Sequence, residues 1–164
     1  MAAPPRVPFP DDLPNPVGAV ILAHSLIGKE LMAAAEYLVG PMDGITSVST
    51  DQQTDAREAR RMISEAIQKV DRGAGVLLFV DLFGGVPCHL AFSFFQEGKI
   101  EVLTGVNLPM ILTFWNRGKN GSLRELATSV RLSGTRSIAV AGDLWEKEGA
   151  TGRGFAKKAR HGGQ

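Results

Sequence analysis

The chain has 164 residues, enough for one domain with a full hydrophobic core and too few for two substantial domains. Its 44% hydrophobic residues, 21% charged residues and net charge of +1 are typical of a globular protein, and argue against disorder and against nucleic-acid binding. No apolar run is long enough to span a membrane, and the single cysteine, Cys88, excludes an internal disulfide and favours the cytoplasm.

The two ends of the chain differ in composition from the part between them. Residues 1–16 are rich in proline and lack the apolar stretch of a secretory signal, so we expect a disordered leader there. The other end is basic from Thr151 onward, among glycines and alanines, and predicts a flexible tail over residues 146–164. We therefore expect a single domain at residues 17–145.

Strand and helix patterns alternate along this domain. Short runs rich in valine, isoleucine and leucine, or alternating with small polar residues, predict strands at residues 17–23, 45–50, 76–80, 100–103 and 137–140. Apolar residues at helical spacing, with turn and capping residues, predict helices at about 28–38, 55–70, 87–96, 110–116 and 122–132. Asp55 with Glu58 indicates a capping box for the second helix, and Ser122 is the expected cap of the last.

This order of elements predicts an α/β fold, with a single doubly wound, mainly parallel sheet and helices on both of its faces. The uninterrupted apolar runs of the first and third strands fit a sheet that is buried on both sides. The short last strand, residues 137–140, lacks an ordinary crossover before it. It is expected to pair at an edge of the sheet, in the same chain or in a second copy.

Two of the predicted strands end in ionisable residues. His24 follows the first strand and Asp81 follows the third, and the carboxyl ends of parallel strands form the functional edge of such a sheet. A histidine oriented by a carboxylate can act as a nucleophile, a base or a metal ligand. An isolated histidine at such a position is more often a satisfied, partly buried residue, and an aspartate a turn residue. The matched loop after Asp81 favours the functional interpretation.

The loops after these two strands suit a phosphoryl group. Ser25 opens the turn before the first helix, while Gly84 and Gly85 let the backbone approach an anion closely. Main-chain amides in such loops can take up charge on phosphoryl oxygens. The sequence has no nucleotide-binding glycine motif, and its three scattered histidines predict neither a metal site nor a cofactor.

Other residues near this edge rank lower. His89 lies in the first turn of its helix and could contact a phosphoryl group, although a polar surface histidine is commoner. Leu82 and Phe83 predict a docking rim for a protein partner or, equally, ordinary core residues. Asn107, at the end of the fourth strand, either braces a loop or faces the site. Cys88 is expected to be a small buried residue.

Three segments resemble a known family: V-I-L-A-H-S at 20–25, V-D-L-F-G-G-V-P at 80–87 and G-V-N-L-P at 105–109. They are similar to the mannose/fructose-type IIA components of the bacterial phosphoenolpyruvate:sugar phosphotransferase system (PTS), in register over residues 17 to 140. The resemblance implies a phosphohistidine carrier, in which His24 accepts a phosphoryl group from the phosphocarrier protein HPr and passes it to a IIB partner. Asp81 would orient His24. The resemblance also implies a homodimer that exchanges its last strand, here expected to be antiparallel, and only indirect membrane contact through a permease.

The chain departs from the family at two positions, with Val86 where a serine is usual and His89 where an asparagine is usual. Loss of the hydroxyl removes a possible donor to the phosphoryl group. Rival interpretations are the phosphotransfer subunit of dihydroxyacetone kinase and a regulatory module that uses the same His24. A receiver domain phosphorylated on Asp81 would need acidic residues after the first strand, which are absent. The resemblance implies a component that does not itself contact a sugar.

Overall fold

A computed structural model of the chain describes residues 17–50, 54–117 and 121–147. The chain divides after Gly134 into two compact units, and each is described by itself. The predicted leader, residues 1–16, and the predicted basic tail beyond Lys147 lie outside the described residues.

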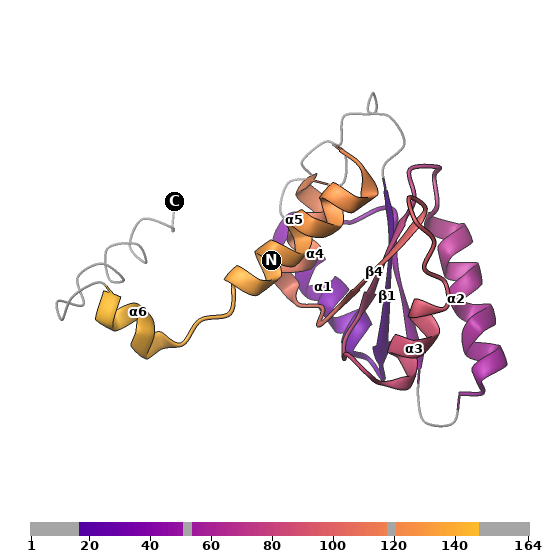
Figure 1. Cartoon of the computed structure of the whole chain (residues 1–164), viewed down its shortest axis with the longest axis horizontal. Helices are drawn as coiled ribbons and strands as arrows, with labels where there is room; N and C mark the ends of the chain where they lie inside the picture. Colours follow the sequence, from indigo (N-terminus) through magenta and orange to yellow (C-terminus); the bar gives the residue numbers. More distant parts are fainter. Residues whose placement is uncertain (1–16, 51–53, 118–120, 148–164) are drawn as a thin grey trace. The chain divides into compact units, whose positions relative to one another are not determined.

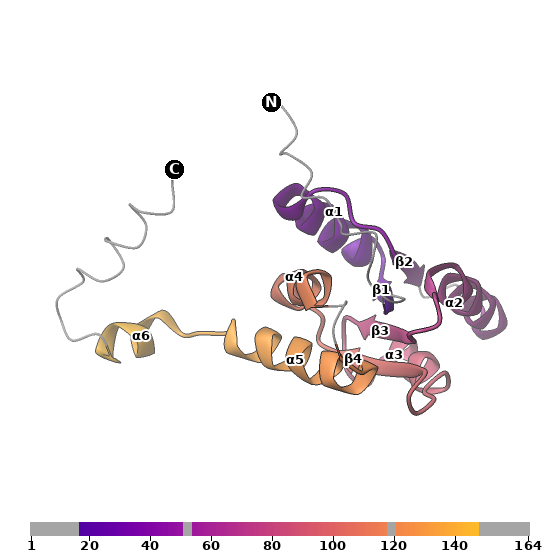
Figure 2. The same cartoon turned by 90° about the horizontal axis from the view of Figure 1, so that it is seen from above.

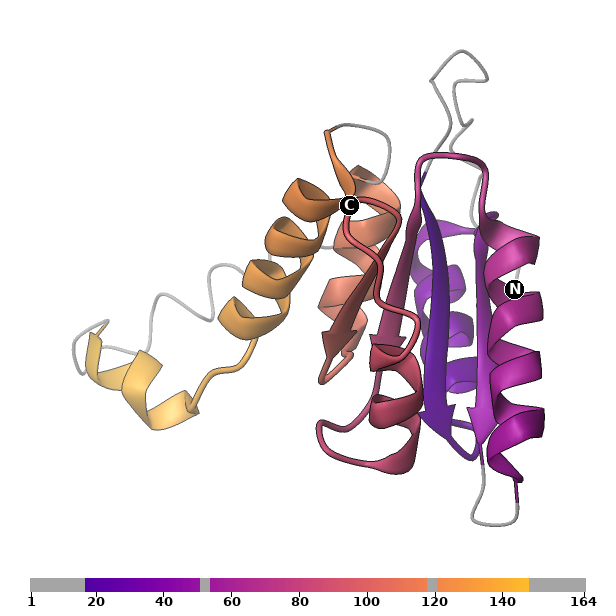
Figure 3. The same cartoon turned by 45° about the vertical axis from the view of Figure 1, so that its right-hand side comes forward.

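The first unit contains a four-stranded sheet (Figure 1). The order of its strands is β2-β1-β3-β4. Its strands are β1 (Gly18–His24), β2 (Ile45–Thr50), β3 (Val76–Val80) and β4 (Ile100–Thr104). All three strand pairs are parallel, so the four carboxyl ends lie at one edge, where the arrowheads gather in Figure 3. The predicted parallel α/β fold is confirmed.

Helices cover both faces of this sheet, as Figure 2 shows. In chain order they are α1 (Ile27–Val39), α2 (Ala56–Val70), α3 (Val86–Phe92), α4 (Leu108–Arg117) and α5 (Leu123–Arg136). The view from above places α1 and α4 on one face and α2 and α3 on the other. The second unit contains α6 (Ala141–Lys147), which the sequence patterns did not predict.

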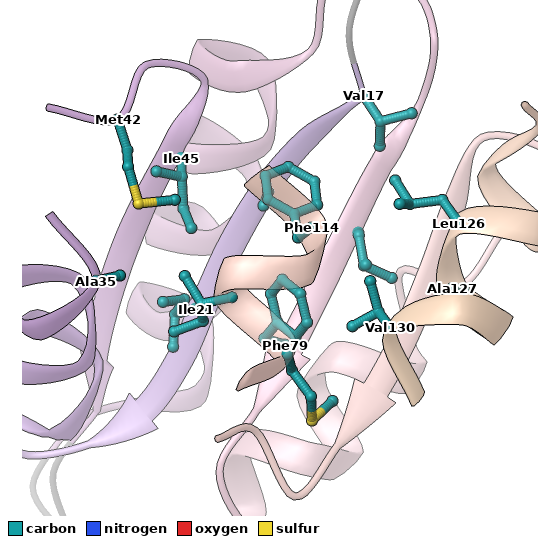
Figure 4. Packing of buried hydrophobic residues seen from close by; sticks show 14 of the residues in the cluster. Val17, Ile21, Ala35, Met42, Ile45, Phe79, Phe114, Leu126, Ala127 and Val130 are labelled. Carbon is teal, nitrogen blue, oxygen red and sulfur yellow. The ribbon is translucent and has the colours of Figure 1, made fainter. Parts of the chain in front are cut away.

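Two hydrophobic clusters fill the space between the sheet and its helices. One packs Ile21 and Phe79 against α1, α4 and α5, and Phe79 meets the Phe114 ring edge-on, with the ring centres 5.9 Å apart (Figure 4). The other packs Leu22 and Val80 against α2 and α3. Successive residues of β1 and β3 therefore face opposite clusters, which explains why both strands are apolar throughout.

Of the two predicted helix caps, the one at α5 forms and the one at α2 does not. Asp55 is the N-cap of α2, but its side chain makes no capping hydrogen bond, and Glu58 binds Arg61 instead. The predicted capping box there is wrong, because the Arg61 guanidinium offers Glu58 a stronger, charged partner. At α5 a complete box forms: the Ser122 hydroxyl accepts from the main-chain N–H of Glu125, and the Glu125 carboxylate accepts from the main-chain N–H of Ser122.

Residues 137–140, predicted as a short last strand, form no strand in the described chain. Ser137 lies in a turn after α5, and the following residues have no regular structure. The side chains of Ile138 and Val140 are strongly exposed, at 76% and 65%. A strand needs a partner to bind its main-chain groups, so pairing of this segment with a second copy stays a prediction.

Candidate functional site

The site is built around a hydrogen-bonded pair at the ends of two adjacent strands. His24 is the last residue of β1, and Asp81 follows β3 directly. Oδ2 of Asp81 accepts a hydrogen bond from the main-chain N–H of His24 at 2.8 Å and lies 2.9 Å from the ring nitrogen Nδ1. A carboxylate at this place holds the proton on Nδ1, so the Nε2 nitrogen carries the lone pair. The predicted pairing is thus present in the structure.

Burial and charge differ between the two partners. The Asp81 side chain is only 9% exposed, whereas the imidazole of His24 is 44% exposed and open to another molecule. Burial alone would raise the pKa of Asp81. The hydrogen bonds from the main chain and ring of His24, the charge of His24 and the main-chain hydrogen bond of Leu82 outweigh burial and lower this pKa below its ordinary value. Asp81 is therefore ionised at neutral pH.

The loop after β1 leaves the strand through a tight turn. Ser25 adopts a left-handed conformation with φ of 51°, which is uncommon for a residue with a side chain. Its main-chain N–H donates to the carbonyl oxygen of Thr50 at the end of β2, at 3.1 Å. This turn leaves the Ser25 side chain exposed beside His24.

The two glycines of the loop after β3 have different structural roles. Gly84 has a φ of +88°, a conformation in which a side chain would be strained. Gly85 is the N-cap of α3, and a Cβ atom there would lie 3.5 Å from Cε1 and 3.9 Å from Nε2 of His24. The backbone of Gly85 therefore lies against the ring edge that carries the free lone pair, and the missing side chain leaves room beside Nε2.

Exposed apolar side chains come from the two loops that flank His24 and from the first residues of the helices α1 and α3. We call this set the apolar collar; its members are Leu26, Ile27, Leu82, Phe83 and Val86, which are between 47% and 73% exposed. The exposure of Leu82 and Phe83 excludes the alternative that they are core residues. Sequence reasoning missed the other three, although their position in or directly after the same two loops was the available signal.

The structure also locates three residues that ranked lower in the sequence, namely His89, Asn107 and Cys88. His89 is exposed, and its side chain makes no hydrogen bond with His24 among the described residues. Asn107 accepts a hydrogen bond from the main-chain N–H of Met110 and donates one to the carbonyl of Gly134, so it caps α4 and braces α5. Cys88 is buried in the core, as expected.

The loop after β4 also supports the site. The main-chain N–H of Val106 donates to the carbonyl of Val80 at 3.0 Å, which fixes the residue just before Asp81. The G-V-N-L-P segment therefore has a structural role, because it holds the end of β3 and begins α4.

Thr50 is a site-edge residue that sequence reasoning missed. It ends β2 and is the register partner of His24 in the parallel pair of β1 and β2. It is only 5% exposed, and its side-chain oxygen has no hydrogen-bond partner among the described residues. Nothing in the sequence alone shows which strand lies beside β1, so this neighbour could not be identified from it.

Fold and site together define a class of protein: a parallel α/β domain that presents a histidine, oriented by a buried carboxylate, at the carboxyl edge of its sheet. The model of the family "PTS system fructose IIA component" matches residues 18–131. The chain therefore belongs to the mannose/fructose IIA family of the phosphotransferase system, and its role lies in phosphotransfer within that sugar system.

Curated relatives agree with this family. The fructose-specific EIIA component of Bacillus subtilis (strain 168) is 23% identical over 132 residues, which cover 80% of this chain and 90% of that protein. The mannose-specific EIIAB component of Escherichia coli (strain K12) is 27% identical over 124 residues, or 74% of this chain. The match spans only 38% of that longer protein.

A solved structure shares the fold. The EIIA component from Streptococcus agalactiae superposes with a TM-score of 0.70 at 19% identity, covering 77% of this chain and 98% of that one. No helix of the described residues is both long and apolar enough to cross a membrane.

Proposed function

We propose that this protein is a cytoplasmic phosphohistidine carrier that accepts a phosphoryl group from phospho-HPr on His24 and passes it to a IIB partner. The observation that carries the proposal is the bond between Asp81 Oδ2 and His24 Nδ1, at 2.9 Å. It leaves Nε2 of the partly exposed His24 ring as the nucleophile. Family membership supplies the phosphotransferase context.

The chemistry needs no cofactor. The Nε2 lone pair of His24 attacks the phosphorus of the donor phosphohistidine, and an N–P bond forms as the donor N–P bond breaks. The electrons of the broken bond return to the donor ring. The proton on Nδ1 stays in its hydrogen bond with Asp81, whose negative charge stabilises the positive charge that develops on the His24 ring.

The loops around His24 would hold the transferred group. The backbone of Ser25, Gly84 and Gly85 lies beside the ring or in the turns that flank it, and main-chain amides are suitable donors to phosphoryl oxygens. His89, exposed on α3, would stand at the rim of this site. These roles are part of the proposal.

The apolar collar would serve as the docking surface for the protein partners. Leu82 and Phe83 are 58% and 73% exposed beside an open imidazole, an arrangement that fits burial against another protein. A carrier must meet its donor and its acceptor through the same histidine. HPr and IIB would therefore bind this face in turn.

Assembly into a homodimer by exchange of residues 137–140 is also proposed. In the sheet, β4 is an outer strand, and among the described residues the side of it that faces away from β3 is bridged only at Ile100, by Gln96. The exposed side chains of Ile138 and Val140 would be buried by a partner subunit. A two-fold exchange of this segment would pair the outer side of β4 and bury these two side chains.

The test is phosphorylation in a purified system. The protein is incubated with labelled phosphoenolpyruvate, enzyme I and HPr, and an acid-labile, base-stable label is expected. His24→Ala should abolish the label, while the control His89→Ala should retain it. Label that persists in His24→Ala, or that disappears only in His89→Ala, would refute the assignment.

A further inference from the structure

The side chains of Thr50 and His24 start from neighbouring strand positions and lie on the same face of the sheet. The parallel register of β1 and β2 pairs His24 with Thr50 and, two residues earlier, Leu22 with Val48. Leu22 and Val48 both belong to the cluster under α2 and α3. Because side chains alternate along a strand, Thr50 and His24 point to this face too, on strands about 4.8 Å apart.

The Thr50 hydroxyl is both buried and unbonded. Among the described residues, Thr50 is the one polar or charged residue that is buried, at 5% exposure. Its Oγ1 atom finds no hydrogen-bond partner there, although the main-chain carbonyl of the same residue accepts from Ser25. Buried hydroxyls are almost always hydrogen-bonded, because an unpaired one destabilises the fold. An orphan beside a reactive histidine therefore needs an explanation.

A second orphan lies on the other side of His24. Oδ1 of Asp81 is buried and has no partner among the described residues, while Oδ2 is engaged with His24. The two orphans differ chemically. A carboxylate oxygen can only accept and repels other anions, whereas a hydroxyl can donate. Of the two, only Thr50 can bind an oxygen of a phosphoryl group.

We propose that the Thr50 hydroxyl donates a hydrogen bond to a phosphoryl oxygen on Nε2 of His24 and so prolongs the life of the phosphohistidine. The inference rests on the proposed function. A hydrogen bond to a charged oxygen at a buried donor is strong, since no water competes for it. The exposed Ser25 hydroxyl is already solvated and gains less, and Val86 offers no hydroxyl on the α3 side.

The test compares Thr50→Val, which keeps the shape and removes the hydroxyl, with Thr50→Ser, which keeps the hydroxyl. Thr46→Val is the matched control, because Thr46 lies on the same strand and face, four residues before Thr50. Each protein is phosphorylated with phosphoramidate, which needs no protein partner. The decay of the phosphohistidine signal at neutral pH is followed by phosphorus NMR, and the Tm of the unphosphorylated protein is measured.

Thr50→Val is expected to shorten the phosphohistidine lifetime by roughly tenfold or more, in line with loss of a charged hydrogen bond. Its Tm should equal or exceed that of the wild type, since an unpaired hydroxyl is removed from the interior. Thr50→Ser and Thr46→Val should behave as the wild type. An unchanged lifetime or a lowered Tm in Thr50→Val, or an equal loss in Thr46→Val, would overturn the role of Thr50. A wild-type protein that is not phosphorylated on His24 would instead overturn the proposed function itself.

Discussion

One carboxylate oxygen of Asp81 holds both the main chain and the ring of His24, with separations of 2.8 and 2.9 Å. The bond to the main chain fixes where β1 ends relative to β3, and the bond to the ring fixes the orientation of the imidazole. Position and reactivity of the nucleophile thus depend on the same oxygen atom.

Asp81→Asn should leave the fold intact and slow phosphoryl transfer to His24. The amide oxygen can still accept both hydrogen bonds, but it has no negative charge to stabilise a positively charged ring. Orienting carboxylates of this kind contribute about 10- to 10⁴-fold. Single-turnover transfer from phospho-HPr measures the rate, and circular dichroism checks the fold. An Asn variant with the wild-type rate would identify Asp81 as a structural turn residue.

Asp81 should also give the protein a stability that disappears in acid. Its pKa is lower in the folded chain than the reference value of 3.8, so the folded state favours the ionised form. This contribution is complete above the pKa of the unfolded chain and is lost as the pH falls through the lower, folded pKa. The Tm advantage of the wild type over Asp81→Asn should therefore shrink below about pH 4. Asp55→Asn is the control, because this exposed side chain makes no capping bond. A constant difference down to pH 2 would contradict the expectation.

Gly85→Ala should separate stability from activity. The backbone of Gly85 has φ of −78°, which alanine adopts freely, and the new Cβ would meet His24 at ordinary contact distances. Its methyl group would occupy the room beside Nε2, where a misplacement of about 1 Å can cost roughly 100-fold in rate. We expect an unchanged Tm and a transfer rate reduced roughly 10- to 100-fold. Gly142→Ala, which meets open space, should change neither quantity. Wild-type transfer by Gly85→Ala would show that the phosphoryl group approaches from another side.

The segment after α5 should control assembly. Truncation after Arg136 removes Ile138 and Val140 and should yield monomers or insoluble protein, because the exchanged strand is lost. Removal of residues 151–164 should leave a dimer. Sedimentation equilibrium distinguishes the cases. A full-length chain that sediments at its monomer mass of 17.5 kDa at micromolar concentration would rule out the exchange.

Much of the site could be predicted because the strands that carry it are buried, and buried strands have a recognisable apolar sequence. The apolar runs before His24 and Asp81 place both residues at strand ends, and parallel pairing brings strand ends together. Thr50 was missed because its importance depends on β2 lying next to β1, a tertiary fact without a local pattern. The exposed apolar residues Leu26 and Ile27 were missed for a similar reason. A hydrophobic residue is normally expected to be buried, and the sequence does not show that a surface binds another molecule.

Capping and the last strand show where local patterns compete with longer-range contacts. Asp55 and Glu58 have the spacing of a capping box, but Arg61 takes the Glu58 carboxylate. Ser122 and Glu125 have the same spacing with no such competitor, and the box forms. Residues 137–140 have the composition of a strand, yet their conformation depends on a partner that a single chain does not supply.

The sequence separation of 57 positions between His24 and Asp81 bears on folding as well as on chemistry. The hydrogen bond between them can form only after the chain has passed through α1, β2 and α2 and brought β3 back beside β1. Such non-local parallel pairing is among the slower steps of folding. An unfolded chain would carry the same histidine without its orienting carboxylate. Fast phosphoryl transfer to Nε2 should therefore begin only when the central strands have joined, and a chain that has not yet folded should react more slowly.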